Sequence, residues 1–169
     1  MGKIDYDLKI HKLSIRIAKL KKRKRFKEQK EKKEKRRERA RKLLKLGLIF
    51  EFTMTDIYSI ELITGYLECL KREASSNLEY YKYLGEKMLK EYSLERHDDR
   101  EVIFLNTAER KARNHKLISL GALFEKTKTD HYLLSIQVGY VDKLHSLSNY
   151  EVESYKLIGK NILNREVIK

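Results

Sequence analysis

The stretch LLKLGLIFEFTMTDIYSIELITGYL (Leu43–Leu67) returns 74 residues later as LISLGALFEKTKTDHYLLSIQVGYV (Leu117–Val141). The two align without a gap, and the wider alignment of Arg36–Leu89 with Arg110–Leu163 gives 20 identities in 54 positions. Three glycine pairs keep the same spacing: Gly47 with Gly121, Gly65 with Gly139, and Gly85 with Gly159. Chance would not preserve three glycine spacings, so we interpret the chain as two tandem copies of one unit.

Each copy is predicted to form three helices. The first carries apolar residues at helical spacing, namely Ala40, Leu43, Leu44, Gly47 and Phe50, matched by Leu117, Ile118, Gly121 and Phe124. It should end at the polar turn, where Thr55 and Thr129 are placed to cap the second helix, with Asp56 and Asp130 at its positive dipole end. Capping boxes at Ser76-x-x-Glu79 and Ser148-x-x-Glu151 announce the third helix, in registers that differ by two residues.

The glycines inside these helices indicate close packing. A glycine costs about 1 kcal/mol relative to alanine in a helix interior, so its presence in both copies favours a tight crossing with another backbone over a ligand contact. We expect the closest approaches at Gly65 and Gly139. The paired tyrosines Tyr66, Tyr81, Tyr140 and Tyr155 are interpreted as half-buried core residues rather than base-stacking platforms.

Composition supports an all-α fold. The 169 residues include no proline and only seven glycines, so few residues interrupt helices. We predict two tandem three-helix repeats preceded by a long basic helix. The expected organisation is a basic N-terminal helical segment at 1–34, repeats at 35–92 and 107–169, and a linker at 93–106. The repeats should pack about a pseudo-twofold or screw relation as one body, because a unit of this size is marginal alone.

The positive charge is concentrated near the N-terminus. Lys19–Lys42 holds 16 Lys and Arg against four Glu, a net of +12, which leaves +2 of the total +14 for the rest of the chain. A nearly neutral body with one very basic segment is typical of a protein that binds polyphosphate. A solvated helix that serves solubility or spacing, an acidic membrane surface and an acidic protein partner remain alternatives.

The basic segment has a helical pattern of its own. Glu28, Glu31 and Glu38 each precede a lysine by four residues, the orientation that supports a helix. One long helix is expected from about Lys12 into the first repeat. At its start, Ile10, Leu13, Ile17 and Leu20 form a separate apolar stripe that should pack on the body or on a second chain.

Candidate nucleic-acid contacts follow from this charge. We expect contacts mainly to phosphate, because no base-reading pattern is recognisable. Arg36, Arg39 and Lys42 recur as Arg110, Arg113 and Lys116 at a spacing that keeps each trio near one helix face, although their stems could instead cover apolar surface. The full candidate set is Lys21, Lys22, Arg23, Lys24, Arg25, Arg36, Arg37, Arg39, Lys42, Arg110, Arg113 and Lys116.

Both copies resemble the TraD family of small conjugal transfer proteins of plasmids and other mobile elements. The resemblance rests on RKARNHKLISLGALFEK (Arg110–Lys126) and its weaker twin RRERARKLLKLGLIFEF (Arg36–Phe52). It departs from the family in having two such units, and in having Gly47-Leu48 and Gly121-Ala122 where a double glycine is frequent. It implies an accessory role in DNA transfer or mobilisation, near a relaxase or another transfer protein.

Catalytic and cofactor motifs are missing from the sequence. The five histidines are scattered, His97-Asp98-Asp99 is interpreted as a solvated linker turn, and no phosphate loop, nucleophile elbow or HExxH occurs. We therefore expect a cytoplasmic binding protein with no cofactor, not an enzyme; the single Cys69 fits a reducing compartment. Alternatives to DNA binding are modulation of a host protein, such as a defence nuclease, and binding to RNA or a ribonucleoprotein.

Overall fold

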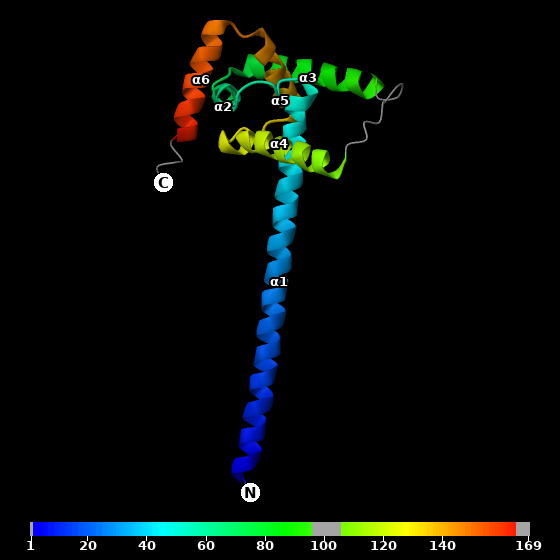
Figure 1. The fold of residues 1–169 in the computed structure, drawn as a ribbon, viewed down its shortest axis with the longest axis vertical. Helices are drawn as coiled ribbons and strands as arrows, with labels where there is room; N and C mark the ends of the chain where they lie inside the picture. The colour runs from blue at the N-terminus through cyan, green and yellow to red at the C-terminus, as the bar shows by residue number, and fades with distance from the viewer. Residues whose placement is uncertain (1, 96–105, 165–169) are drawn as a thin grey trace. The chain divides into compact units, whose positions relative to one another are not determined.

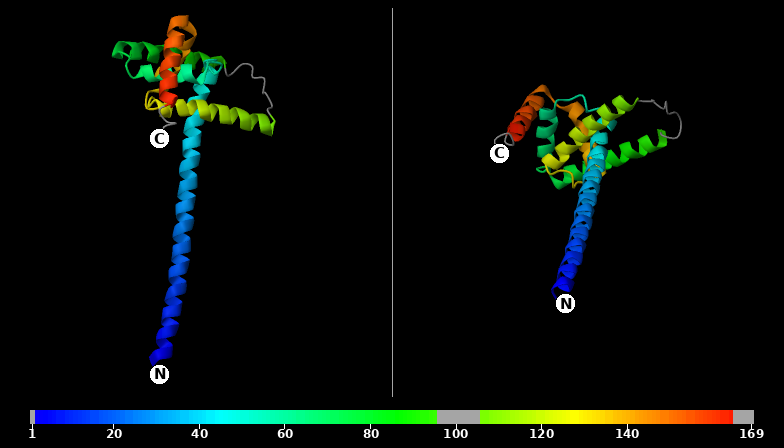
Figure 2. Two further views of the ribbon diagram at one scale, coloured as in Figure 1. Left: turned by 60° about the vertical axis from the view of Figure 1, so that its left-hand side comes forward. Right: turned by 60° about the horizontal axis from the view of Figure 1, so that its bottom comes forward.

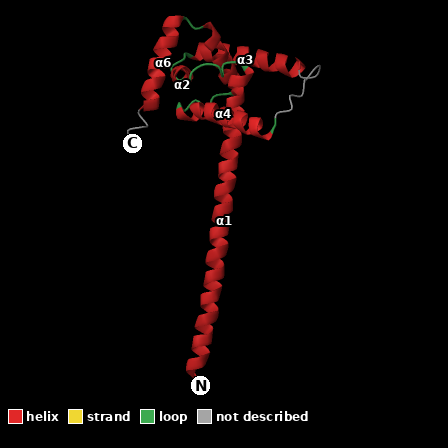
Figure 3. Cartoon of the chain, in the orientation of Figure 1, coloured by secondary structure: helices red, strands yellow, loops and turns green. Residues whose placement is uncertain are grey.

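Helices account for every regular element in the described part of the chain, as the sequence predicts. The computed structural model describes the backbone of residues 2–95 and 106–164 and the side chains of residues 9–93 and 106–164. Figure 3 shows helices joined by loops, with no strand in these ranges. Most of the predicted linker, with the His97–Asp99 turn, lies outside the described residues. No described helix is long and apolar enough to cross a membrane.

The helices follow one another as labelled in Figure 1. Their bounds are α1 (Gly2–Phe52), α2 (Ile60–Leu70), α3 (Ser75–Glu95), α4 (Thr107–Lys126), α5 (Leu134–Asp142), the 3-10 helix η1 (Lys143–Ser146) and α6 (Asn149–Asn164). The expected long first helix is confirmed, and it begins earlier than Lys12. Its length is consistent with a sequence that has no glycine or proline between residues 3 and 46.

The chain divides into two compact units, residues 1–41 and 42–169. We call residues 2–41 the arm and residues 42–164 the body. The sequence-based boundary between residues 34 and 35 lies seven residues earlier than this structural division. The arm consists of α1 up to Arg41, and the body contains the end of α1 together with α2 to α6.

In the body, the helices of one copy pack on helices of the other. Helix α2 of the first copy lies beside α6 of the second, and α3 of the first lies beside α5 of the second (Figures 1 and 2). These are reciprocal pairings, since α2 and α5 are equivalent and so are α3 and α6. The second helix of each copy therefore covers its apolar face with the third helix of the other copy.

Paired glycines allow these helices to meet at backbone distance, which confirms the tight crossings expected from the sequence. A Cβ atom added to Gly65 would lie 1.8 Å from the carbonyl oxygen of Tyr155, and one added to Gly139 would lie 2.1 Å from that of Tyr81. At the other four paired glycines the added Cβ atom would lie 1.8 to 2.0 Å from a carbonyl oxygen, in the crossings of α1 with α4, α2 with α6 and α3 with α5. The approach at Gly139 is therefore not among the closest, contrary to expectation. No side chain larger than hydrogen fits at any of the three crossings without moving a backbone.

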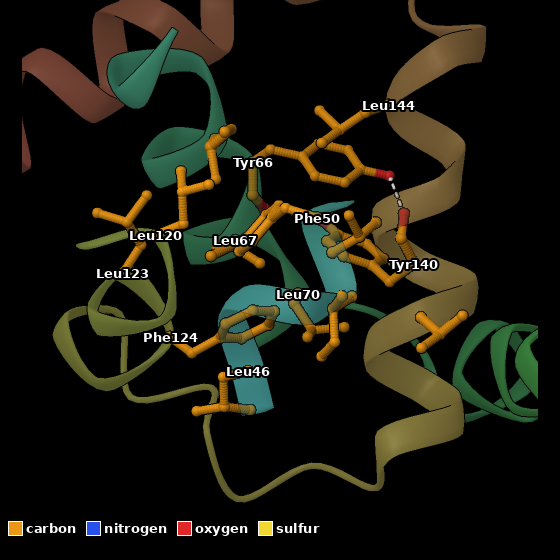
Figure 4. Packing of buried hydrophobic residues seen from close by; sticks show 14 of the residues in the cluster. Leu46, Phe50, Tyr66, Leu67, Leu70, Leu120, Leu123, Phe124, Tyr140 and Leu144 are labelled. Atoms are coloured by element: carbon orange, nitrogen blue, oxygen red, sulfur yellow. Dashed lines mark hydrogen bonds between the residues drawn. The ribbon is translucent and has the colours of Figure 1, made fainter. Parts of the chain in front are cut away.

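Equivalent aromatic residues meet at the centre of the core. Phe50 and Phe124 have ring centroids 5.2 Å apart, and the rings of Tyr66 and Tyr140 stack at 4.3 Å. The hydroxyl of Tyr66 donates to the carbonyl oxygen of Tyr140 at 3.0 Å (Figure 4). The hydroxyl of Tyr140 donates in turn to the carbonyl oxygen of Tyr66 at 2.9 Å. Burial raises the pKa of both phenols well above the ordinary value, which keeps them protonated as donors. Tyr66 and Tyr140 are buried rather than half-buried, while Tyr81 and Tyr155 are partly buried.

The turn after the first helix of each copy differs from the prediction. Thr55 does not cap α2, because Ser59 holds that position and its hydroxyl accepts from Leu62 N; Leu133 precedes α5 without a side-chain cap. Instead Thr55 and Thr129 are buried, and their hydroxyls bond at 2.8 Å to Thr53 and Thr127 respectively. The two threonines close the end of the preceding helix, not the start of the next one.

The residue between each threonine pair has a left-handed backbone. Met54 has φ 54° and Lys128 has φ 55°, and both are exposed. The amide of Thr55 donates to the carbonyl oxygen of Phe50, and that of Thr129 to Phe124, at 2.8 and 2.9 Å. This bond five residues back is the helix-ending pattern that usually places glycine in the left-handed position.

The starts of the third helices correct a second expectation. Helices α3 and α6 begin at Ser75 and Asn149, which are equivalent positions, so the loops do not differ in register. The capping box at Ser148 forms, with Glu151 accepting from Ser148 N at 2.8 Å. Ser76 lies inside the first turn of α3 and is not a cap. A capping box that we did not predict, Asn106 with Glu109, begins α4.

Candidate nucleic-acid interface

The cations predicted at the start of the basic segment all lie on the surface of the arm. Each is exposed to solvent, and none has a carboxylate partner among the described residues: Lys21, Lys22, Arg23, Lys24 and Arg25. Successive residues of a helix point about 100° apart, so these five side chains surround the helix axis. The arm is therefore positive on all sides and not along a single face.

The arm leaves nearly all of its cations available to a partner. Apart from Arg39, no Lys or Arg between Lys19 and Arg41 forms an ion pair with a carboxylate in the described part of the chain. The glutamates have the predicted spacing, but Glu28 and Glu31 do not come within ion-pair distance of Lys32 and Lys35 in the described ranges. The acidic residues of the arm thus do little to neutralise its charge locally.

One aromatic side chain lies among these cations. Phe26 is exposed, and with Lys19, Lys22 and Arg23 it lines a shallow hollow on the surface of the arm. An aromatic ring beside cations can stack an unpaired base while the cations hold the phosphates on either side. The sequence places a single aromatic residue in this basic stretch, so the hollow could accept one base at most.

Three of the predicted nucleic-acid contacts in the body bind carboxylates of the protein itself. Lys42 of the first copy forms an ion pair with Asp130 of the second, and Lys116 of the second copy forms the equivalent pair with Asp56 of the first. Lys42 is therefore not paired with Glu38, as its spacing suggested. The Lys42 ammonium donates to Asp130 and holds the pKa of that carboxyl below its usual value.

Arg113 completes this set of contacts between the copies. Its guanidinium donates two hydrogen bonds to the carboxylate of Glu51, at 2.8 and 2.7 Å, and these bonds raise its pKa. We call the contacts of Lys42, Arg113 and Lys116 the cross-copy ion pairs. They are solvent-exposed, so each contributes about 1 kcal/mol or less to stability. Their main effect is to fix how the two copies align with each other.

The remaining predicted contacts are exposed. Arg36 and Arg37 lie on the arm, and Arg110 lies on the surface of the body near the start of α4. Arg39 is also exposed but has an interaction within the protein, so the proposed interface does not depend on it. Because a DNA contact by Lys42, Arg113 or Lys116 would have to displace a carboxylate, we leave those three out of the proposed interface as well.

Sequence reasoning missed the acidic partners, although the sequence carries a signal for them. Glu51 and Asp56 are identical in both copies, as Glu125 and Asp130, and they accompany cations that are also identical. Opposite charges kept together in both copies indicate mutual pairing, whereas a polyphosphate site needs only the cations. Asp56 and Asp130, expected at the positive end of a helix dipole, are partners of Lys116 and Lys42.

The body shows no sign of a buried chemical site within the described ranges. No group of His, Cys, Asp or Glu there could hold a metal ion, and no buried side-chain polar atom lacks a hydrogen-bond partner. Cys69 is partly buried, and burial raises the pKa of its thiol, which favours the less reactive protonated form. No protein-family model, curated protein or solved structure matches the chain.

Proposed function

We propose that this protein binds nucleic acid through the exposed cations of its arm, from Lys19 to Arg41, by contacts to phosphate. The observation that carries the proposal is a helix covered with exposed Lys and Arg side chains, almost none of which has a carboxylate partner in the described part of the chain. The body differs, because Lys42, Arg113 and Lys116 form ion pairs that join the two copies. Charge that a protein does not neutralise internally is the charge that attracts polyanions.

The dimensions of the arm fit a duplex. Residues 19–41 form 23 residues of α1, which span about 35 Å at 1.5 Å per residue, close to one turn of B-DNA. Because the cations surround the helix, roughly half of them can face one duplex at a time. Of the 16 Lys and Arg in Lys19–Lys42, Arg39 and Lys42 have partners, which leaves 14 and hence about seven simultaneous phosphate contacts.

DNA transfer or mobilisation is the context we propose for this binding. The support is the resemblance of both copies to the TraD family at Arg36–Phe52 and Arg110–Lys126. In that context the protein would act as an accessory factor of a plasmid or other mobile element, with the body as a scaffold that presents one arm. The body itself contributes the exposed Arg110 as an additional phosphate contact.

The proposal is tested by removing charge from the arm and from the body in equal amounts. Replacing Lys21, Lys22, Arg23, Lys24 and Arg25 together by glutamine should weaken duplex binding strongly and make it less dependent on salt. For about seven phosphate contacts, wild-type affinity should fall by ~10³–10⁴ between 50 and 200 mM salt, a slope set by counterion release. Gel shifts or fluorescence anisotropy at several stated salt concentrations measure both quantities.

The matched control carries the same loss of net charge on the body. Five exposed lysines outside the arm, replaced together by glutamine, should change affinity much less: Lys45, Lys90, Lys111, Lys128 and Lys160. Equal effects of the two variants would mean that net charge alone attracts the polyanion, and an unchanged salt slope in the arm variant would overturn the proposal.

Duplex DNA, single-stranded DNA and RNA compared in the same buffer separate the DNA assignment from RNA binding. Phe26→Ala should affect only the single strands.

A further inference from the structure

The arm carries an apolar stripe ahead of its main basic stretch. Ile10, Leu13, Ile17 and Leu20 are 64, 57, 52 and 55% exposed, respectively, although all four are large apolar residues. Their spacing of three, four and three residues is that of the a and d positions of a coiled-coil heptad over two repeats. The stripe therefore has the exposure of a surface whose packing partner is still to be identified.

The width of the stripe favours a helix as its partner. At about 100° per residue, the four side chains fall within an arc of about 80°. That is the narrow seam of a coiled coil, whereas a helix lying on a bilayer or on a globular core presents a broader apolar face. Ile15 and Phe26, the other exposed apolar residues nearby, lie on the opposite side of the helix and do not widen the seam.

The charges beside the stripe argue against a second copy of this chain. Residues 9–23 contain seven Lys and Arg and no Asp or Glu. Arg16 and Lys21 flank the seam at the two heptad positions that face each other across a parallel pair, so two arms would oppose cation to cation. An antiparallel pair would oppose cations equally. A partner with carboxylates beside its own seam would instead gain from the same residues.

We propose that the stripe Ile10–Leu13–Ile17–Leu20 docks an amphipathic helix of another protein, one with a two-heptad apolar seam flanked by Asp and Glu. The stripe and the proposed phosphate-binding stretch then divide the arm between two partners, a protein helix nearer the N-terminus and nucleic acid beyond it. This proposal does not rest on nucleic-acid binding, because it uses different side chains and a different chemistry.

The test uses the full chain and a designed probe. The probe is a fluorescent helical peptide of three heptads with Leu at a and d and Glu at e and g; a second peptide has Lys at e and g. Wild-type protein should bind the acidic peptide, with affinity that falls as salt rises, and should not bind the lysine peptide. Leu13→Ala with Ile17→Ala should weaken binding at least tenfold. Alanine keeps the helix intact, which circular dichroism verifies.

Ile15→Ala is the matched control, since it removes an exposed apolar side chain from the opposite face of the same turn and should change affinity less than twofold. Unchanged affinity in both variants would show attraction to charge alone, and equal losses in both would show that the stripe is not the binding face; either result would overturn the proposal. So would stripe-dependent binding to phosphatidylserine vesicles without peptide binding, or stripe-dependent self-association in sedimentation equilibrium. Duplex affinity that stays within twofold in the stripe variant supports two separate partner sites, whereas a parallel loss contradicts them.

Discussion

The arm and the body use the same residue types for different purposes. Lys and Arg between Lys19 and Arg41 are exposed on a helix that its own backbone hydrogen bonds maintain, and the large apolar residues between Ile10 and Phe26 are exposed as well. In the body, Lys42, Lys116 and Arg113 reach carboxylates of the opposite copy, and the apolar residues form one core. Whether a cluster of Lys and Arg is free to bind a partner therefore depends on whether the fold places carboxylates beside it.

The contrast extends to the backbone. The three glycine crossings in the body are contacts between copies, so the helices that form them depend on one another for stability. Within the arm, no described apolar side chain is buried, so its helix is maintained mainly by its own backbone hydrogen bonds. We therefore expect cooperative unfolding of the body and local, independent opening of the arm.

Separating the two copies has the largest expected effect. Residues 35–92 and 107–169, expressed apart, should each lose the fold, because α2 and α3 pack on α6 and α5 of the other half. Mixing equal amounts should restore helicity and a cooperative melt, measured by circular dichroism. Sedimentation at two concentrations is the control for pairing of a half with itself. A half that melts cooperatively as a monomer would show that the body is two independent domains.

Filling one glycine crossing should cost less but still destabilise the body severely. A Cβ atom at Gly85 would lie 1.9 Å from the carbonyl oxygen of Ser135, so Gly85→Ala must push α3 away from α5. We expect a loss of about 3 kcal/mol in the free energy of unfolding, at the upper end of overpacking effects. Glu86→Ala, at the adjacent exposed position, should have little effect in the same urea titration. Comparable losses in both variants would remove the crossing as the cause.

Acid should weaken the cross-copy ion pairs by a small amount. The pKa of Asp130 is lowered in the folded state by Lys42, so its contribution is present above its unfolded value near 4 and disappears as pH falls through the folded value. Asp130→Asn should therefore lower the melting temperature at pH 7, by the equivalent of about 1 kcal/mol or less, and should match wild type near pH 2. Asp142→Asn is the control in a helix outside these pairs. A difference that persists at pH 2 would mean that packing, not charge, was lost.

Much of the fold could be predicted because the internal repeat supplies a comparison within one chain. The 74-residue offset located the helices and marked the crossing glycines, since a costly residue kept in both copies needs a backbone neighbour. The turn chemistry could not be settled in this way. Thr55 is equally suited to cap the next helix or to close the preceding one, and the choice depends on the burial of the threonine pair, which local sequence does not reveal.

The candidate site was predictable in the arm and not in the body. A dense run of cations without apolar neighbours has no way to become buried, so its exposure followed from composition. Lys42 and Lys116 could not be assigned from spacing, because their partners lie 88 and 60 residues away in the chain. Spacing within one copy does not predict these ion pairs, because each of them joins residues of different copies.

The reciprocal packing of the two copies has a consequence for stoichiometry. Two free half-molecules with the same contacts would form a symmetric dimer, whose assembly would weaken on dilution and which would carry two identical arms. Joined in one chain, the halves meet at an effective concentration set by their connection, so the body forms at any protein concentration. Covalent linkage also allows the N-terminal segment to be attached to one half only. Each molecule thus carries a single arm on a body whose two halves pack reciprocally.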